Sequence, residues 1–159
     1  MIIDALRYKN TDTAEEKGYD AGKKVSGIKR HFAVDTLGLP HAIYVSTANV
    51  TDRTGALEAF STKAASLTTL SNVIADSSYT GKDFADKVQE LLNSSVTIVK
   101  RSEQHKFVVL PKRWIVESTE AWLEKCRRLW KNCERKLETS RQMGVKAFLS
   151  LLLKRGAID

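Results

Sequence analysis

The sequence predicts an α/β protein built on a mixed five-stranded sheet with helices packed against it. Short β-rich apolar runs follow one another in the first half, and a helical apolar pattern occupies the last third. The predicted element order is β, β, β, α, β, α, β, α, α. Strands that alternate with helices after an initial antiparallel set give a mixed sheet covered by helices. A chain of 159 residues suffices for one domain with a core of its own.

The first three strands come before any helical pattern. A short strand is predicted at residues 1–4, and the polar, glycine-containing stretch 9–27 is predicted as a loop. Two β-rich runs follow at 28–35 and 41–48. Between them lies the turn TLGLP, so these two runs are expected to form an antiparallel hairpin.

Helices and strands begin to alternate after residue 48. Asp52 precedes a helical pattern and is well placed to cap the N-terminus of that helix. A strand at 72–76 then ends on Asp76, a helix begins near Lys82, and a further strand covers 95–101. These units complete the predicted sheet.

The last third is predicted to be helical. From 113 to 138, apolar residues recur every three or four positions, which is typical of one continuous amphipathic helix with a charged opposite face. A final helix is predicted at about 141–155. It contains the apolar run AFLSLLL, predicted to be buried and far shorter than the roughly 20 residues that span a membrane.

The single predicted domain, 1–159, has two parts. Residues 1–110 form the sheet core with two helices, and residues 111–159 form the C-terminal helices that carry Glu117 and a basic face. Cys126 and Cys133 lie on the apolar face of the predicted helix and lack metal-type spacing. Core filling in a reducing cytoplasm is therefore expected.

Positive charge is concentrated in the C-terminal part. The net charge is +7, with 11 Lys/Arg and 12 Asp/Glu in residues 1–99 against 15 and 7 in residues 100–159. Lysine and arginine gathered in this way favour a polyanion such as nucleic acid. A solvated helical surface accounts for the same charge equally well.

Three acidic residues form the candidate catalytic group. Two apolar runs end in aspartate, at Asp4 and at Asp76, and parallel neighbouring strands would bring both carboxylates into one crevice. Glu117, near the start of the long helix, is a natural third acid. Such oxygen ligands suit a pair of Mg²⁺ or Mn²⁺ ions, which serve phosphoryl transfer. Each acid taken alone is as well explained as a helix cap or a solvated charge.

The amino-acid sequence of several stretches is more specific than the spacing of the three acids. The matching stretches cover nearly the whole chain and include TANVTDRTGALEAF, ADSSYTGKDFADKV and RWIVESTEAWLEKCRRLWKNCERK. With them the chain resembles bacterial insertion-sequence transposases of the DDE class, of the insertion-sequence-five kind. The resemblance implies a ribonuclease-H-like catalytic core that cleaves DNA with divalent metal ions. The freed 3′-hydroxyl would then attack target DNA.

The resemblance also implies roles for particular residues. Asp4, Asp76 and Glu117 correspond to the family's metal-binding catalytic triad, and Arg113 matches its signature arginine. The expected partners are transposon-end and target DNA, with no membrane, in a homo-oligomer of the full-length protein at the bacterial nucleoid. The DNA-binding residues are expected on the basic face: Arg113, Lys125, Arg127, Arg128, Lys131 and Arg135.

The chain departs from the family pattern at several positions. Ser78 replaces a glycine, Ser118 replaces an arginine, Leu110 replaces a tyrosine and Glu124 replaces a lysine. The segment after Asp4 is less polar than expected. The chain begins at the first catalytic strand, so the N-terminal DNA-binding region is expected to be missing.

Two interpretations therefore stay open. One is a working DDE catalytic core. The other is a truncated or degenerate remnant that binds DNA weakly without catalysis. A receiver-like phosphoacceptor domain, which also gathers acids at strand ends, is a third and weaker alternative, because the opening hairpin and the basic C-terminal helix disfavour it.

Overall fold

The structure, a computed structural model, describes residues 1–67, 69–99 and 113–156. The strands are β1 (Ile2–Lys9), β2 (Gly18–Asp20), β3 (Val25–Val34), β4 (Pro40–Thr47), β5 (Asn72–Asp76) and β6 (Ser95–Val99). The helices are α1 (Asp52–Ser61), α2 (Lys82–Leu92), α3 (Arg113–Glu124) and α4 (Leu137–Gly156), with the 3₁₀ turns η1 (Ala64–Ser66) and η2 (Ser77–Tyr79). The predicted order is confirmed, with the short β2 added.

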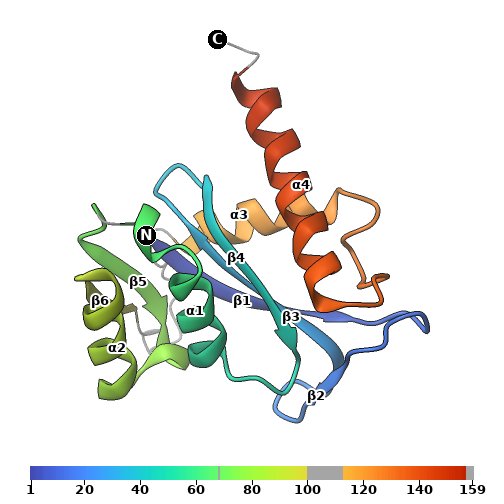
Figure 1. Cartoon of the computed structure of the whole chain (residues 1–159), viewed down its shortest axis with the longest axis horizontal. Coiled ribbons are helices and arrows are strands. Elements are labelled where there is room, and N and C mark those ends of the chain that lie inside the picture. The colour runs from blue at the N-terminus through green and yellow to red at the C-terminus, as the bar shows by residue number, and fades with distance from the viewer. Residues whose placement is uncertain (68, 100–112, 157–159) are drawn as a thin grey trace, which may run out of the picture.

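The strands form one mixed sheet (Figure 1). β3 pairs antiparallel with β1 on one side and with β4 and β2 on the other. β5 pairs parallel with both β1 and β6. The five main strands therefore lie in the order β4-β3-β1-β5-β6, which confirms the predicted α/β class and is consistent with a ribonuclease-H-like fold.

Helices cover both faces of the sheet. α1 and α2 pack on one face, where Phe60 and Val88 are fully buried in the largest apolar cluster. α3 and α4 pack on the other face, where Leu123 and Phe148 contact Phe32 of β3. Because strand side chains alternate between faces, the residues of β1 divide between these two layers.

The first strand is longer than predicted. β1 has eight residues and pairs with β3 along its whole length, so Asp4 lies inside the strand and not at its tip. The strand continues because Leu6 and Tyr8 extend the alternation begun by Ile2, and Tyr8 is buried. The predicted loop at 9–27 likewise contains β2 and the start of β3.

The predicted continuous helix over 113–138 is wrong. α3 ends at Glu124, and turns follow to residue 136. The buried Arg30 guanidinium donates a hydrogen bond to the Leu129 carbonyl, 2.5 Å away, and Asn132 pairs with the end of β1. These contacts take backbone groups that a helix would use within itself.

The last helix is also longer and more exposed than predicted. α4 begins at Leu137, and its Phe148 is buried, whereas Leu149 and Leu153 are more than half exposed. Its far end extends beyond the sheet (Figure 1). Within the described part of the chain, no helix is long and apolar enough to cross a membrane.

Candidate active site

Asp4 and Asp76 occupy matching positions on two neighbouring parallel strands. Ile2 of β1 pairs with Ile74 of β5, and each aspartate lies two residues further along its own strand. Residues two apart on a strand share a face, and neighbouring strands lie roughly 4.8 Å apart. The two carboxylates therefore belong to the same face and the same end of the β1–β5 pair. The sequence could state the parallel pairing of these two strands only as a condition, and the structure contains it.

Asp76 is oriented by the chain that follows it. Its Oδ1 accepts hydrogen bonds from the Ser78 backbone N–H, at 2.9 Å, and from the Ser78 hydroxyl, at 2.5 Å. Asp76 is thereby the N-cap of η2. Asp4 is held in a similar way, because its Oδ1 accepts the Ala5 N–H at 2.8 Å. Asp76 thus does cap a short helix, and this capping fixes the direction of its carboxylate.

α3 lies over the same face of the sheet. Its Ile115 and Val116 are buried in one apolar cluster with Ile2 and Val34, and Ile74 packs against that cluster. Glu117 is the next residue of α3 and is exposed. The helix that carries Glu117 therefore packs on the face of the sheet to which Asp4 and Asp76 belong.

The three acids do not form a closed cage. Among residues 1–67, 69–99 and 113–156, no three His, Cys, Asp or Glu side chains are grouped closely enough to hold a metal ion. The roles of Asp4, Asp76 and Glu117 therefore stay predictions. Arg113 is the first residue of α3, and its side chain lies outside the described part of the chain, as do Lys100, Arg101 and Leu110.

Tyr79 is a buried neighbour of the acids that sequence reasoning missed. It is 1% exposed, and its hydroxyl has no hydrogen-bond partner among the described residues. Burial raises the pKa of Tyr79 well above its ordinary value, and three nearby carboxylates raise it further. These belong to Asp4, Asp52 and Asp76. The hydroxyl therefore stays protonated at neutral pH.

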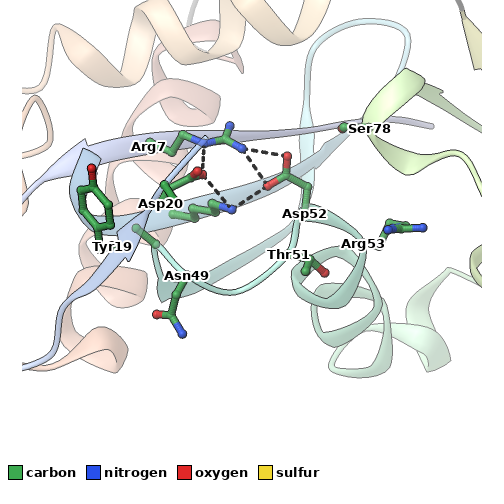
Figure 2. A pocket seen from close by; sticks show the side chains of 11 residues that line it. Arg7, Tyr19, Asp20, Asn49, Thr51, Asp52, Arg53 and Ser78 are labelled. Atoms are coloured by element: carbon green, nitrogen blue, oxygen red, sulfur yellow. Dashed lines mark hydrogen bonds and ion pairs between the residues drawn. The ribbon is translucent and has the colours of Figure 1, made fainter. Parts of the chain in front are cut away.

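Four charged residues form a closed network on the opposite face of β1 (Figure 2). Arg7 contacts Asp20 at 2.7 Å and Asp52 at 3.0 Å, and Lys29 contacts the same two carboxylates at 3.2 and 3.1 Å. The hydrogen bond from Arg7 holds the pKa of Asp20 far below its usual range. We call these four residues the ion-pair network. The network joins β1, β2, β3 and the start of α1.

The predicted role of Asp52 as a helix cap is wrong. The N-cap of α1 is Thr51, whose hydroxyl accepts the Thr54 N–H, and Asp52 is the first helical residue. Its carboxylate is turned instead toward Arg7 and Lys29. Spacing gives no signal for this arrangement, because the partners come from strands distant in the sequence.

An open cavity of about 430 Å³ adjoins this network. The network forms one part of its lining, and Ser78, the residue that holds Asp76, forms another (Figure 2). Arg53 at its rim donates a hydrogen bond to the Thr80 carbonyl at 3.0 Å. The cavity thus connects the network with the turn that carries Asp76.

Arg113, one of the six predicted DNA-binding residues, begins α3, whereas the other five follow α3 and are not on a helix. Lys125 and Arg127 are exposed, and the Lys131 ammonium lies 4.4 Å above the Trp130 ring. Arg128 forms an ion pair with Glu134, and Arg135 forms one with Glu15. The five cations therefore share one irregular segment, and two of them are partly neutralised.

A mixed sheet of this strand order, with aspartates at matched positions on two parallel strands, is consistent with the ribonuclease-H-like class. The chain belongs to the family described as transposase DDE domain, whose model matches residues 1–153. It is therefore a catalytic domain of the DNA-transposition class, and membership implies a DNA substrate. The search of curated proteins gives no match. The predicted resemblance is confirmed for DDE transposases, while the insertion-sequence-five kind and a bacterial origin stay predictions.

Proposed function

We propose that this chain cleaves DNA strands and joins the freed 3′ ends to target DNA, with divalent metal ions bound by Asp4, Asp76 and Glu117. The observation that carries the proposal is the register of β1 and β5, which puts two aspartates at matching positions beneath the helix that bears Glu117. Family membership supports the same chemistry.

The donor set fits a hard divalent cation. All three proposed ligands are carboxylates, the oxygen donors that Mg²⁺ and Mn²⁺ take from proteins. A bound pair of such ions stabilises the attacking and leaving oxygens of an in-line displacement at phosphorus.

The chain's own residues would prepare and support that step. Ser78 orients Asp76, and the neutral Tyr79 hydroxyl provides a buried polar group close to the acids without adding negative charge. Water would attack the scissile phosphodiester, releasing a 3′-hydroxyl and leaving a 5′-phosphate. That 3′-hydroxyl would then attack a phosphodiester of the target DNA, forming a new phosphodiester and releasing a 3′-hydroxyl of the target strand. The exposed Lys125 and Arg127 would bind the DNA backbone by displacing counterions.

The test is a nicking assay on supercoiled plasmid with Mn²⁺ or Mg²⁺. Asp4→Asn, Asp76→Asn and Glu117→Gln are each expected to lower the nicking rate by roughly 100-fold or more, since even residues outside a metal's direct ligands cost 10–100-fold. The matched control is Asp86→Asn, an exposed acid on α2. Joining of a labelled 3′-hydroxyl oligonucleotide to the plasmid measures strand transfer. Equal residual nicking in all five proteins would overturn the proposal and favour a DNA-binding remnant.

A further inference from the structure

Trp130 is a large aromatic side chain displayed at the surface by a firmly anchored backbone. It is 57% exposed, although its neighbour Leu129 is 2% exposed and packs in the core beneath α4. The Leu129 carbonyl accepts a hydrogen bond from the buried Arg30 at 2.5 Å. The backbone immediately before Trp130 is therefore held in place.

The residues after Trp130 are anchored as well. The Asn132 backbone N–H donates to the Lys9 carbonyl at 3.0 Å, and its own carbonyl accepts the Thr11 N–H at 2.9 Å. Its side chain donates to Asn10, and Asn132 is 1% exposed. Trp130 and Lys131 thus lie between two anchored residues, Leu129 and Asn132. The Trp130 indole is exposed, so it is not held in place by packing in the core.

The surroundings of the indole are strongly basic. Residues 125–136 contain six Lys or Arg and one Glu. The Lys131 ammonium lies 4.4 Å from the centroid of the Trp130 ring, a cation–π contact. Arg127 and Lys136 are exposed nearby in the sequence. An aromatic face among cations suits a partner that combines negative charge with flat rings.

We infer that the segment 125–136 binds single-stranded DNA, with an unpaired base stacked on Trp130 and the adjoining phosphates held by Lys131 and Arg127. The inference rests on the proposed function, which supplies DNA as the partner. A single strand is favoured over a duplex because stacking within a duplex covers the faces of the bases, whereas an unpaired base can offer its face to an aromatic side chain. α3 links this segment to the candidate active site, and Glu124 lies seven helical steps beyond Glu117, a rise of roughly 10 Å.

The experiment measures binding of a fluorescein-labelled 12-nucleotide single strand, and of the matching duplex, by anisotropy in EDTA. Without divalent metal no cleavage occurs, so the measurement does not depend on the metal site. Trp130→Ala is expected to weaken single-strand binding by roughly 5- to 150-fold, the range for loss of one stacked base. Duplex binding should change less than about twofold, and Trp130→Phe should keep most of the affinity because it keeps an aromatic face.

Two controls make the outcome specific. Tyr19→Ala removes another exposed aromatic residue, on β2, and should leave single-strand binding unchanged. Lys131→Gln should reduce the salt dependence of single-strand binding by a slope of about 0.7. Equal affinities of Trp130→Ala and the native chain, or equal losses for single strand and duplex, would overturn the inference. If Trp130 proves to bind single-stranded DNA and the nicking assay fails, only the proposed function is overturned. If the nicking assay succeeds and Trp130→Ala has no effect, only the inference about Trp130 is overturned.

Discussion

The two faces of β1 hold carboxylates in different ways. On the α1 face, Asp20 and Asp52 each contact both Arg7 and Lys29, at 2.7 to 3.2 Å. On the α3 face, Asp4 accepts a hydrogen bond from the backbone of the next residue, and Asp76 accepts two from Ser78. Asp20 and Asp52 are each paired with two cations, and Asp4 and Asp76 are oriented in part by residues adjacent in the chain.

This difference separates structural acids from candidate ligands. Each acid of the ion-pair network is paired with cations of the same network, and the four side chains are only 5–20% exposed. Removing one member therefore leaves an oppositely charged side chain largely buried with fewer partners, which destabilises the fold. Asp4 and Asp76 are instead the proposed ligands of a metal ion, so their substitution would act on the proposed reaction. We therefore expect substitutions on the α1 face to affect stability first, and substitutions on the α3 face to affect activity first.

The largest expected effect on stability is that of Asp52→Ala. It leaves Lys29, whose side chain is 5% exposed, with one carboxylate partner in place of two. We expect the free energy of unfolding to fall by about 2–3 kcal/mol, since breaking a buried pair costs about 3–5 and this pair is partly exposed. Asp76→Ala should cost about 1 kcal/mol, the value of a helix cap. Urea denaturation at pH 7 measures both, and equal losses would contradict the distinction between the two faces.

A second effect on the α1 face depends on pH. His31 is buried behind Gly55 of α1, and its Nε2 lies 2.8 Å from the Ser46 hydroxyl. Burial lowers the pKa of His31 to about 4, well below its ordinary value. Below pH 6.5 the unfolded chain therefore binds a proton that the folded chain does not, and stability is lost as the pH falls.

We expect the native chain to lose about 2 kcal/mol of stability between pH 7 and pH 5 through this histidine. His31→Gln should abolish that part of the loss, because glutamine can still bond Ser46 but does not titrate in this range. Asp20 adds little in the same window, since its depressed pKa matters only as the pH falls below about 5. Urea denaturation at both pH values measures the change, and the same slope in both proteins would exclude His31 as its source.

The sheet and its aspartates could be predicted because their signals are local. Ile2 and Asp4, and likewise Ile74 and Asp76, show the alternation of a strand within a few residues. The packing of α3 on that face also follows from its apolar Ile115 and Val116. The matched register of β1 and β5 could be stated only as a condition, because it joins two strands that are distant in the sequence.

The break after α3 and the ion-pair network could not be predicted, because both depend on distant partners. Arg30 contacts Leu129 across 99 positions of the chain, and Arg7 contacts Asp52 across 45. A helical apolar period continues through Cys126 and Leu129, so the local pattern alone favours helix. Tertiary hydrogen bonds from buried residues outweigh that preference, which is worth only tenths of a kcal/mol per residue.

The smallest expected effect concerns Ser78. Its hydroxyl donates to Asp76 Oδ1 at 2.5 Å, while its backbone N–H holds the same oxygen at 2.9 Å. Ser78→Ala removes only the first bond. If Asp76 binds metal as proposed, we expect the nicking rate to fall roughly two- to tenfold, the value of one hydrogen bond, with stability changed by less than about 1 kcal/mol.

The half-saturating Mn²⁺ concentration distinguishes positioning of the carboxylate from a general structural role. Ser78→Ala should raise that concentration, because a carboxylate that is less firmly oriented loses more conformational entropy when it binds the ion. The matched control is Ser77→Ala, the preceding exposed serine of η2. An unchanged Mn²⁺ dependence in Ser78→Ala would mean that the backbone bond suffices to orient Asp76.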